Sequence, residues 1–377
     1  MKKALIVGAG ASGIFSALLL AEKHADWEIT IVEKEQKIGK KLRATGNGHC
    51  NLLNEKLDPS YYNPRSKLAR ELLKEHDLVE CKAVLERWGV PLLQIGDLDY
   101  PLSYHAPSFV NHLVSLLQEK GVKIEQQTRF IDYQINNRFI DVSTDKFNRP
   151  YDIVIFASGG CSTPKLGSDG ALFEIFAKHG YKIQKLSPGL TPIVVKEPIA
   201  KSLVGLRHKA TVTLYDDKGA PVYSEKGEYL YKKNGLSGIC IFNIASKIKW
   251  LEIKKPLIRI DLFDGINTQG FFKTYLPNEA ILESPLYEEI VRQSLRTGIQ
   301  PGEIAHCLTY HPAASYSFED SQVTIGGIDE NCLSNSLGSS IEKNVYFVGE
   351  AIDVDGLCGG FNLSWSLLSA IHLIKGL

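Results

Sequence analysis

The chain has 377 residues, and its 43 Lys and Arg residues balance its 43 Asp and Glu residues. This length allows two or three domains, and the balanced charge gives no global field that would attract nucleic acid or an anionic membrane. Seven scattered cysteines without C-x-x-C spacing argue against a disulfide framework or a zinc site, so no metal is expected. No apolar stretch reaches the length of a membrane span. We therefore expect a cytoplasmic protein with reduced thiols, no nucleic-acid partner and no membrane partner.

The first 34 residues carry the most informative pattern. Residues 4–7 form a short apolar run typical of a buried strand, helical periodicity covers residues 11–23, and a second apolar strand covers residues 28–32. Three glycines between the first strand and the helix have G-x-G-x-x-G spacing: Gly8, Gly10 and Gly13. Glu33 follows the second strand, at the position that binds ribose hydroxyls in dinucleotide folds. Strand, glycine loop, helix and acid together predict a site for FAD or NAD.

Each glycine has a separate physical role in such a loop. Gly8 allows a tight turn, Gly10 lets the backbone approach a pyrophosphate, and Gly13 lets the helix pack close to the sheet. The unpaired N–H groups of the helix N-terminus then face the phosphates.

Residues 37–51 form a basic cluster that continues into a polar, glycine-rich loop. A charge run is usually solvated, but this one follows the ribose-binding strand directly, which favours cofactor contact for part of the loop. Asn47, His49 and Asn51 could face a flavin ring or substrate, although a turn also needs such residues.

The middle of the chain alternates between helical and strand patterns. Helical spacing is expected at residues 61–88, 108–119 and 171–179, and short strands at 122–125, 129–135 and 139–143 are expected to form an antiparallel meander. The apolar strand 153–156 ends in Ser158-Gly159-Gly160, a second glycine turn after a strand.

The later part changes character twice. Residues 190–262 alternate in a strand-like way, 267–304 return to helical spacing, and strands resume near 308 and at 323–325. Residues 345–348 then form a buried strand that leads to Gly349-Glu350, and a helix is expected at 363–374. We expect a discontinuous Rossmann-like FAD-binding domain (1–189 and 334–377), a β-rich domain (190–264 and 306–333) and a small helical insert (265–305). The fold class is therefore α/β, with the β-rich, barrel-like domain interrupting the Rossmann-like domain.

Three glycine-terminated strands are expected to meet at one edge of the sheet, because ligands of doubly wound folds bind at the carboxyl ends of the strands. A second glycine-led helix begins near Gly359-Gly360 and would direct its positive end at an anion or a carbonyl dipole. NAD alone does not need this second helix, whereas the electron-rich edge of a flavin does. The pattern favours FAD.

Several motifs resemble those of one family of flavoproteins: GAGASG, GKKLRATGNGHCN, ASGG, GLSGICIFNI, VTIGGID and GEAIDVDGLCGGFNLSWSLLSA. They are similar to the BaiN-type (YhiN-like) family of NAD(P)/FAD-dependent oxidoreductases, and they extend from residue 8 to residue 370. The resemblance implies an FAD-binding Rossmann-like domain interrupted by a β-barrel-like domain with a helical insert. Members often carry Arg where this chain has His49, and the segment 267–304 is short for the family.

The resemblance also implies where FAD binds. The expected cofactor-binding residues lie within the quoted motifs and beside them: Gly8, Gly10, Ala11, Ser12, Gly13, Glu33, Lys34, Lys41, Leu42, Thr45, Gly46, Asn47, Gly48, Cys50, Asn51, Ser158, Gly159, Gly160, Gly349, Glu350, Asp355, Gly360, Phe361, Asn362 and Leu363.

The function that follows is flavin redox chemistry: a hydride passes through flavin N5 from a donor to a small organic acceptor or dioxygen. The chain has no second G-x-G-x-x-G, so NADH or NADPH would act only as a transient donor over the flavin, or the electrons come from elsewhere. The alternative is a flavin-binding regulatory or sensor protein without rapid turnover. Candidate proton donors are His49, Tyr104 and His105, but each could equally be a loop residue with local hydrogen bonds. The substrate and the oligomeric state do not follow from the sequence.

Overall fold

The computed structural model describes residues 1–272 and 277–377, and the chain divides into two compact units. The first unit contains residues 1–187 and 323–377, and the second contains residues 188–322. The chain therefore enters the first unit a second time at residue 323, as the repeated strand–glycine–helix pattern indicates.

The first unit is built on a five-stranded parallel sheet with the order β20-β10-β1-β2-β6. Its strands are β1 (Lys3–Val7), β2 (Glu28–Glu33), β6 (Lys123–Gln126), β10 (Ile153–Phe156) and β20 (Val345–Phe347). All four residues of β10 are buried, as expected for a central parallel strand that is covered on both faces. Because the strands are parallel, their carboxyl ends lie at one edge.

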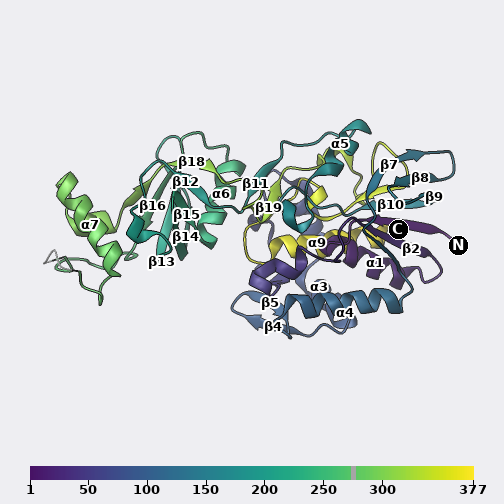
Figure 1. Ribbon diagram of the computed structural model, residues 1–377, viewed down its shortest axis with the longest axis horizontal. Coiled ribbons are helices and arrows are strands. Elements are labelled where there is room, and N and C mark those ends of the chain that lie inside the picture. Colours follow the sequence, from purple (N-terminus) through teal and green to yellow (C-terminus); the bar gives the residue numbers. More distant parts are fainter. Residues whose placement is uncertain (273–276) are drawn as a thin grey trace. The chain divides into compact units, whose positions relative to one another are not determined.

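Helices cover one face of this sheet and a meander covers the other (Figure 1). On the helical side are α1 (Ala11–Lys23), α4 (Ala106–Glu119) and α9 (Phe361–Gly376). The meander is formed by β7 (Phe130–Ile135), β8 (Ile140–Thr144) and β9 (Asn148–Tyr151), with α5 (Ala171–Lys178) on the same side. The buried faces of α1 and α9 pack against each other, which ties the two ends of the chain together.

The meander differs from the expected one by one strand. Residues 122–125 do not belong to it: they lie in β6, which pairs in parallel with β2, while β9 takes the third place in the meander. The sequence pattern did not reveal this pairing, because β6 lies at the edge of the sheet, has no fully buried residue and lacks the continuous apolar run of a central parallel strand.

The helical stretch expected at residues 61–88 is divided into two helices, α2 (Lys67–Glu75) and α3 (Leu78–Arg87). His76 is extended between them, and the Asp77 carboxylate caps α3 by accepting a hydrogen bond of 2.9 Å from the Glu80 amide. A small antiparallel sheet of β3 (Leu53–Asn54), β5 (Leu98–Pro101) and β4 (Leu92–Ile95) completes this region.

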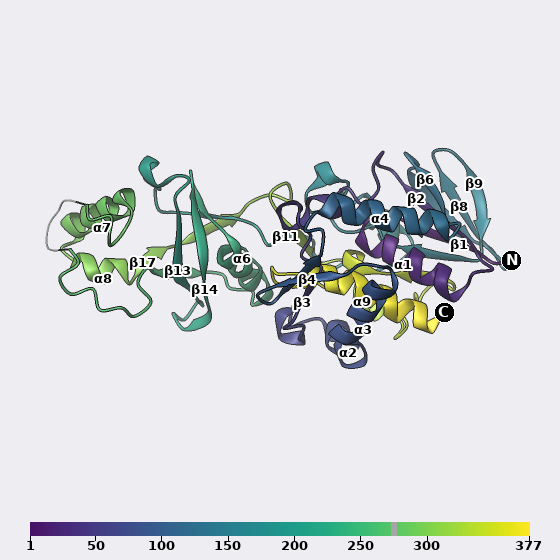
Figure 2. The same cartoon turned by 90° about the horizontal axis from the view of Figure 1, so that it is seen from below.

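The second unit contains an antiparallel sheet with the order β17-β16-β13-β14-β15-β12-β18. Its strands are β12 (Ile193–Val195), β13 (Arg207–Tyr215), β14 (Pro221–Lys232), β15 (Gly235–Ser237), β16 (Leu257–Asp261), β17 (Leu308–Tyr310) and β18 (Pro312–Ser315). The paired strands β13 and β14 run through the centre of this unit (Figure 2). Helices α7 (Ser284–Thr297) and α8 (Pro301–Ala305) lie in the expected helical insert, of which residues 273–276 are outside the described residues.

One helix of the second unit was not expected. Strand-like alternation was predicted through residue 262, but Ile239–Trp250 form α6, whose Cys240, Ile241, Ile244 and Ala245 are buried in the core of the unit. These positions have helical spacing, but the segment is rich in β-branched isoleucines, which favour strands, so a strand was predicted.

The second segment of the first unit begins at residue 323, earlier than the expected boundary at 334. Strand β19 (Val323–Ile325) belongs to it, because the Thr324 hydroxyl accepts hydrogen bonds from the amides of Cys161 (2.7 Å) and Ser162 (3.1 Å). Ile328 adds bridges to Ile183 and Ile352. These contacts were hidden in the sequence because their partners lie far away along the chain. Between the two units the chain runs through β11 (Ser187–Gly189).

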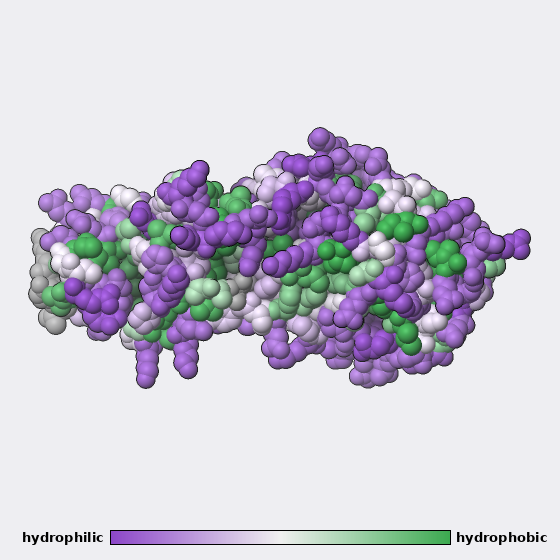
Figure 3. All heavy atoms as spheres, turned by 90° about the horizontal axis from the view of Figure 1, so that it is seen from above, coloured by the Kyte–Doolittle hydropathy of each residue, from purple (hydrophilic) through white to green (hydrophobic). Residues whose placement is uncertain are grey.

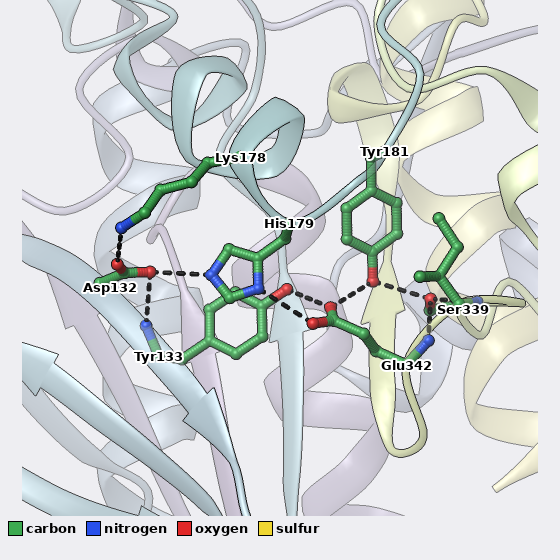
Figure 4. A network of polar contacts seen from close by, with 8 residues as sticks. Asp132, Tyr133, Lys178, His179, Tyr181, Ser339 and Glu342 are labelled. Atoms are coloured by element: carbon green, nitrogen blue, oxygen red, sulfur yellow. Dashed lines mark hydrogen bonds and ion pairs between the residues drawn. The ribbon is translucent and has the colours of Figure 1, made fainter.

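A polar network fastens the meander to α5 and to the segment before β20 (Figure 4). The His179 ring lies between two carboxylates, with Nε2 2.9 Å from Asp132 Oδ1 and Nδ1 2.9 Å from Glu342 Oε1. Tyr133 stacks on this ring, with 3.9 Å between centroids, and its hydroxyl donates to Glu342. The Tyr181 hydroxyl donates to the same carboxylate at 2.8 Å. Glu342 precedes β20, so the network holds the amino end of the sheet.

The surface is mostly polar on the face drawn in Figure 3, where hydrophobic residues occur in small separate groups. Among the described residues, no helix is both long enough and apolar enough to cross a membrane.

Candidate cofactor site

The loops after β1, β10 and β20 meet at the carboxyl edge of the parallel sheet. At several of their glycines they touch so closely that a side chain would not fit. A methyl group on Gly8 would lie 2.6 Å from the Ala157 carbonyl oxygen, and one on Gly349 would lie 2.4 Å from Ser12 Oγ. One on Gly13 would lie 2.0 Å from the Gly8 carbonyl oxygen. Gly13 thus packs closely, as predicted, and Gly8, for which a tight turn was predicted, has a positive φ of 102° and packs closely as well.

The N-terminus of α1 is open for an anion. Gly10 is its N-cap, no described side chain caps it, and its first turn contains no acid. A methyl group on Gly10 would meet nothing within 4 Å, so this glycine is not required by packing inside the protein. The N–H groups of Ala11, Ser12 and Gly13 belong to the first turn, where they lack intrahelical partners. Space, unpaired donors and a positive helix end are the features that a phosphate cradle requires.

Glu33 lies at the end of β2 beside this cradle. Its carboxylate accepts hydrogen bonds of 2.8 Å from the backbone amides of Ala9 and Glu35. These two bonds fix the carboxylate, which as a four-site acceptor can still accept ribose hydroxyls. Lys34 pairs with Asp169 at 2.5 Å and Lys40 with Glu35 at 2.8 Å, so part of the basic cluster is neutralised by nearby acids.

The polar loop that follows has an unusual backbone. The segment Leu42–Gly48 is helical at both ends but interrupted inside, where Gly46 (φ 57°) and Asn47 (φ 53°) are left-handed and exposed, while Leu42 is buried. Cys50 is fully buried, and burial raises the pKa of its thiol to about 12. It is therefore a structural thiol and not a redox group. The loop ends at Asn51, whose carbonyl oxygen lies close to Gly360.

A charged network joins this loop to the other two. The Lys41 ammonium lies 3.1 Å from Glu350 Oε2 and also donates to the Ser162 hydroxyl. Glu350 Oε1 accepts from that hydroxyl at 3.1 Å and from the Thr324 amide at 2.6 Å. Gly159 lies beside the same carboxylate, and Gly160 lies against the Thr324 side chain. Lys41 and Glu350 were expected at the cofactor. Ser162 and Thr324 were not, because they carry no motif of their own.

The second helix N-terminus lies where the sequence places it. Helix α9 begins at Phe361 after Gly360 (φ 88°), without a capping side chain among the described residues and without an acid in its first turn. A methyl group on Gly360 would lie 2.8 Å from the Leu53 carbonyl oxygen, so only glycine brings this helix end so close to β3.

Polar side chains hold the loop before α9. The Asn362 side chain accepts from the Gly356 amide and donates to the Gly356 carbonyl, both at 2.9 Å. The Asn63 amide donates to the buried Asp355 carboxylate at 3.1 Å, and Asn54 donates to the Gly359 carbonyl at 2.7 Å. Asp355 is thus engaged with Asn63. No sequence motif pointed to Asn54 or Asn63.

The expected proton donors have different environments. His105 is the N-cap of α4: its Nδ1 contacts the hydroxyl and amide of Ser108, so its ring is held in a capping role. His49 stacks on Tyr104, with 4.0 Å between centroids, and its Nδ1 lies 2.9 Å from the Tyr104 carbonyl oxygen. A carbonyl only accepts, so His49 Nδ1 carries the hydrogen. Tyr104 has a left-handed backbone (φ 48°), a strained conformation of the kind that clusters at functional sites.

These features fit FAD on the geometry of the chain itself. Gly10 leaves space that nothing else fills, Glu33 presents a fixed acceptor beside it, and two helix N-termini without side-chain caps lie at one sheet edge. One helix end suits the pyrophosphate, and the other suits the electron-rich edge of the flavin.

Sheet, phosphate cradle and second glycine-led helix define an FAD-dependent oxidoreductase of the Rossmann type, as the sequence predicted. The chain belongs to the family described as HI0933-like protein Rossmann domain, which matches residues 2–374. It is 30% identical to the 3-dehydro-bile acid delta(4,6)-reductase of Clostridium scindens, over 97% of this chain and 96% of that protein. It is 24% identical to the ribosomal RNA dihydrouridine synthase of Escherichia coli, over the same shares of both chains. Among solved structures, the 3-ketosteroid-delta4-(5alpha)-dehydrogenase of Rhodococcus jostii has a TM-score of 0.49 and 12% identity, over 99% of this chain and 97% of that one.

Proposed function

We propose that this enzyme reduces a carbon–carbon double bond conjugated to a carbonyl group in a small organic molecule. The Clostridium scindens relative is named for reducing double bonds of a 3-dehydro-bile acid, and the Escherichia coli relative is named for forming dihydrouridine. Both names describe the addition of two hydrogens to a double bond that is conjugated with a carbonyl. This shared reaction type is more specific than oxidoreduction in general, but it does not select either relative's substrate.

One observation carries the flavin chemistry of the proposal: among the described residues no side chain caps the N-terminus of α9, which lies at the same sheet edge as that of α1. Bound FAD would supply the redox chemistry, because a flavin both accepts and donates a hydride. The role of α9 is to stabilise the negative charge that develops on a reduced flavin. Lys41, held by Glu350 and Ser162, places its ammonium group in the loop at this edge.

A proton must also reach the reduced substrate, and His49 is our candidate donor. Its Nδ1 hydrogen is held by the Tyr104 carbonyl, and stacking on Tyr104 fixes the ring plane. Nε2 is then the nitrogen from which the protonated ring can give up a proton. The half-exposed position of His49 lets solvent restore that proton.

The electron donor in this proposal is NADH or NADPH, bound transiently over the flavin. The sequence has a single G-x-G-x-x-G motif and therefore no dedicated nicotinamide domain, so in this proposal the nucleotide docks directly over the flavin. A sensor without rapid turnover would lack a fast reduction by either nucleotide.

The test begins with the visible spectrum of the purified protein under anaerobic conditions. We expect a flavin spectrum that is bleached by NADH or NADPH and restored by a cyclic enone, with a product two hydrogens heavier by mass spectrometry. A protein that takes up no FAD contradicts the cofactor assignment. A reduced enzyme that dioxygen reoxidises but no enone does contradicts the proposed acceptor.

A second candidate substrate is uridine in ribosomal RNA, which undergoes the same reaction. Residues 196–259 contain 13 Lys and Arg residues against 6 Asp and Glu residues, so a basic segment exists within a chain of zero net charge. Such a segment suits a phosphate backbone. Incubating the reduced enzyme with unmodified ribosomal RNA and measuring dihydrouridine by mass spectrometry separates the two: RNA reduction without enone reduction favours this candidate.

A further inference from the structure

Two histidines and a glutamate meet between α2 and α9, on residues that the cofactor site does not use. Glu75 is the last residue of α2, His76 follows it, and His372 lies near the C-terminal end of α9. His76 Nε2 lies 2.9 Å from His372 Nδ1, and Glu75 Oε2 lies 3.4 Å from the same His372 nitrogen. One atom from each of the three side chains lies within 4.8 Å of the other two.

The outer nitrogens of both rings are bound to acceptors. His76 Nδ1 lies 2.8 Å from Glu80 Oε2, and His372 Nε2 lies 2.5 Å from the backbone carbonyl oxygen of Asn335. Lys375 binds the other oxygen of the Glu80 carboxylate at 2.5 Å. Because neither Glu80 nor the Asn335 carbonyl offers a hydrogen, both outer nitrogens must carry one.

The inner nitrogens of two neutral rings then point their lone pairs at each other. Two lone pairs at 2.9 Å repel unless a cation lies between them, and His76 is only 4% exposed, so water cannot screen the contact well. The nearby Glu75 carboxylate adds a third lone-pair donor and a negative charge. Histidine ligands whose second nitrogen is held by a carboxylate or a carbonyl are typical of metal sites in proteins.

We propose that His76 Nε2, His372 Nδ1 and Glu75 Oε2 bind a zinc ion, with water as the fourth ligand. Zinc takes nitrogen ligands at about 2.0–2.1 Å in tetrahedral geometry, which requires about 3.3 Å between the two nitrogens. The rings therefore need to separate by only about 0.4 Å to receive the ion. Both outer hydrogen bonds already orient the rings for it.

This ion would have a structural role. His372 lies twelve residues after Gly360 along α9, or about 18 Å at 1.5 Å per residue, so it is remote from the glycine-led end of the helix. The ion would join the end of α2 to the end of α9. It would also remove the repulsion between the lone pairs of His76 Nε2 and His372 Nδ1.

The test uses the full-length protein without a histidine tag, freed of metal by a chelator and titrated with Co²⁺. We expect one equivalent to produce the ligand-field bands of a four-coordinate site, and Zn²⁺ to displace it. His372→Gln should abolish the bands, and Glu75→Gln should weaken binding by at least about tenfold. Glu71→Gln, on an exposed residue of the same helix, should bind Co²⁺ like the wild type.

Circular dichroism of each variant establishes that it is folded. If His372→Gln does not fold, Glu75→Gln still tests the proposal, because Glu75 is exposed and its substitution should not disturb folding. A wild-type protein without ligand-field bands overturns the proposal, since the rings would then share a proton. Bands that persist unchanged in both ligand variants overturn it as well.

Discussion

At the scale of single residues, two glycines of the first loop have different surroundings: one is closely packed, and the other faces open space. Gly13 is needed by the protein itself, because a methyl group there would lie 2.0 Å from the Gly8 carbonyl oxygen. A methyl group on Gly10 would meet no described atom within 4 Å, so packing inside the protein does not require a glycine there. The sequence motif predicted different roles for the two positions, close packing for Gly13 and space for a pyrophosphate at Gly10, and the packing at Gly13 agrees with its predicted role.

Two alanine variants test this distinction. Gly13→Ala should lower the free energy of unfolding by about 1–3 kcal/mol, because the helix must move away from the sheet. Gly10→Ala should leave unfolding almost unchanged but weaken FAD binding by at least about tenfold, because its methyl group occupies the space for the pyrophosphate. Urea denaturation and FAD titration measure the two effects. Equal losses of stability in both variants would contradict this separation.

The stacked pair of His49 and Tyr104 leads to a second residue-scale prediction. His49→Gln should retain FAD and its spectrum but lose turnover by about 10²–10⁴-fold, the usual contribution of a positioned general acid. His105→Gln is the matched control and should change stability more than turnover, because His105 caps α4. A turnover loss confined to His105→Gln would contradict the assignment.

At the scale of elements, the helices and strands that could be predicted are those with a clear periodicity of apolar residues in the local sequence. Helix α1 and strands β1, β2 and β10 have strong periodicity next to glycine turns, and their bounds agree with the sequence analysis within a residue or two. Helix α6 was missed, because its buried isoleucines favour strands locally and only the surrounding core selects the helix. Strand β6 was assigned to the wrong sheet, because pairing with β2 is a contact between distant parts of the chain. The supporting residues Ser162, Thr324, Asn54 and Asn63 were missed for the same reason.

The junction of the meander with α5 should make stability depend on pH. Burial alone would raise the pKa of Asp132, but hydrogen bonds from Lys178, His179 and the Tyr133 amide outweigh it and lower that pKa from 3.8 to about 2. A carboxylate with a lowered pKa stabilises the fold above its unfolded pKa and loses this contribution as the pH falls. We therefore expect about 1–2 kcal/mol of stability to disappear between about pH 4 and about pH 2.

Asp132→Asn tests this dependence. The variant should be less stable than the wild type at neutral pH, and the difference should shrink as the pH falls through that window, as measured by urea denaturation at each pH. Asp26→Asn, at an exposed residue, should follow the wild type throughout. A difference that stays constant down to pH 2 would show that the carboxylate charge is not the cause.

At the scale of the whole molecule, the two units have separate cores. Residues from β13, β14, α6 and α7 form the core of the second unit, while the residues proposed to bind the cofactor all belong to the first. A ligand stabilises only those regions whose opening releases it.

Hydrogen exchange with and without FAD should therefore reveal this division. We expect slower exchange at residues 8–13, 41–51, 159–162 and 349–363, and no change along β13 and β14. Peptide-level mass spectrometry measures both in one experiment. Protection spread evenly over the two units would contradict independent stabilisation, and protection absent from 349–363 would remove α9 from the cofactor site.

The discontinuous first unit has a consequence for how the protein is made. Strand β20 pairs with β10 and α9 packs on α1, so the last part of the chain completes a sheet begun by the first residues. During translation, the second unit leaves the ribosome before β20 and α9 exist. We therefore expect a nascent chain to expose an incomplete sheet until β20 and α9 have been synthesised, because these two elements complete the sheet and cover it.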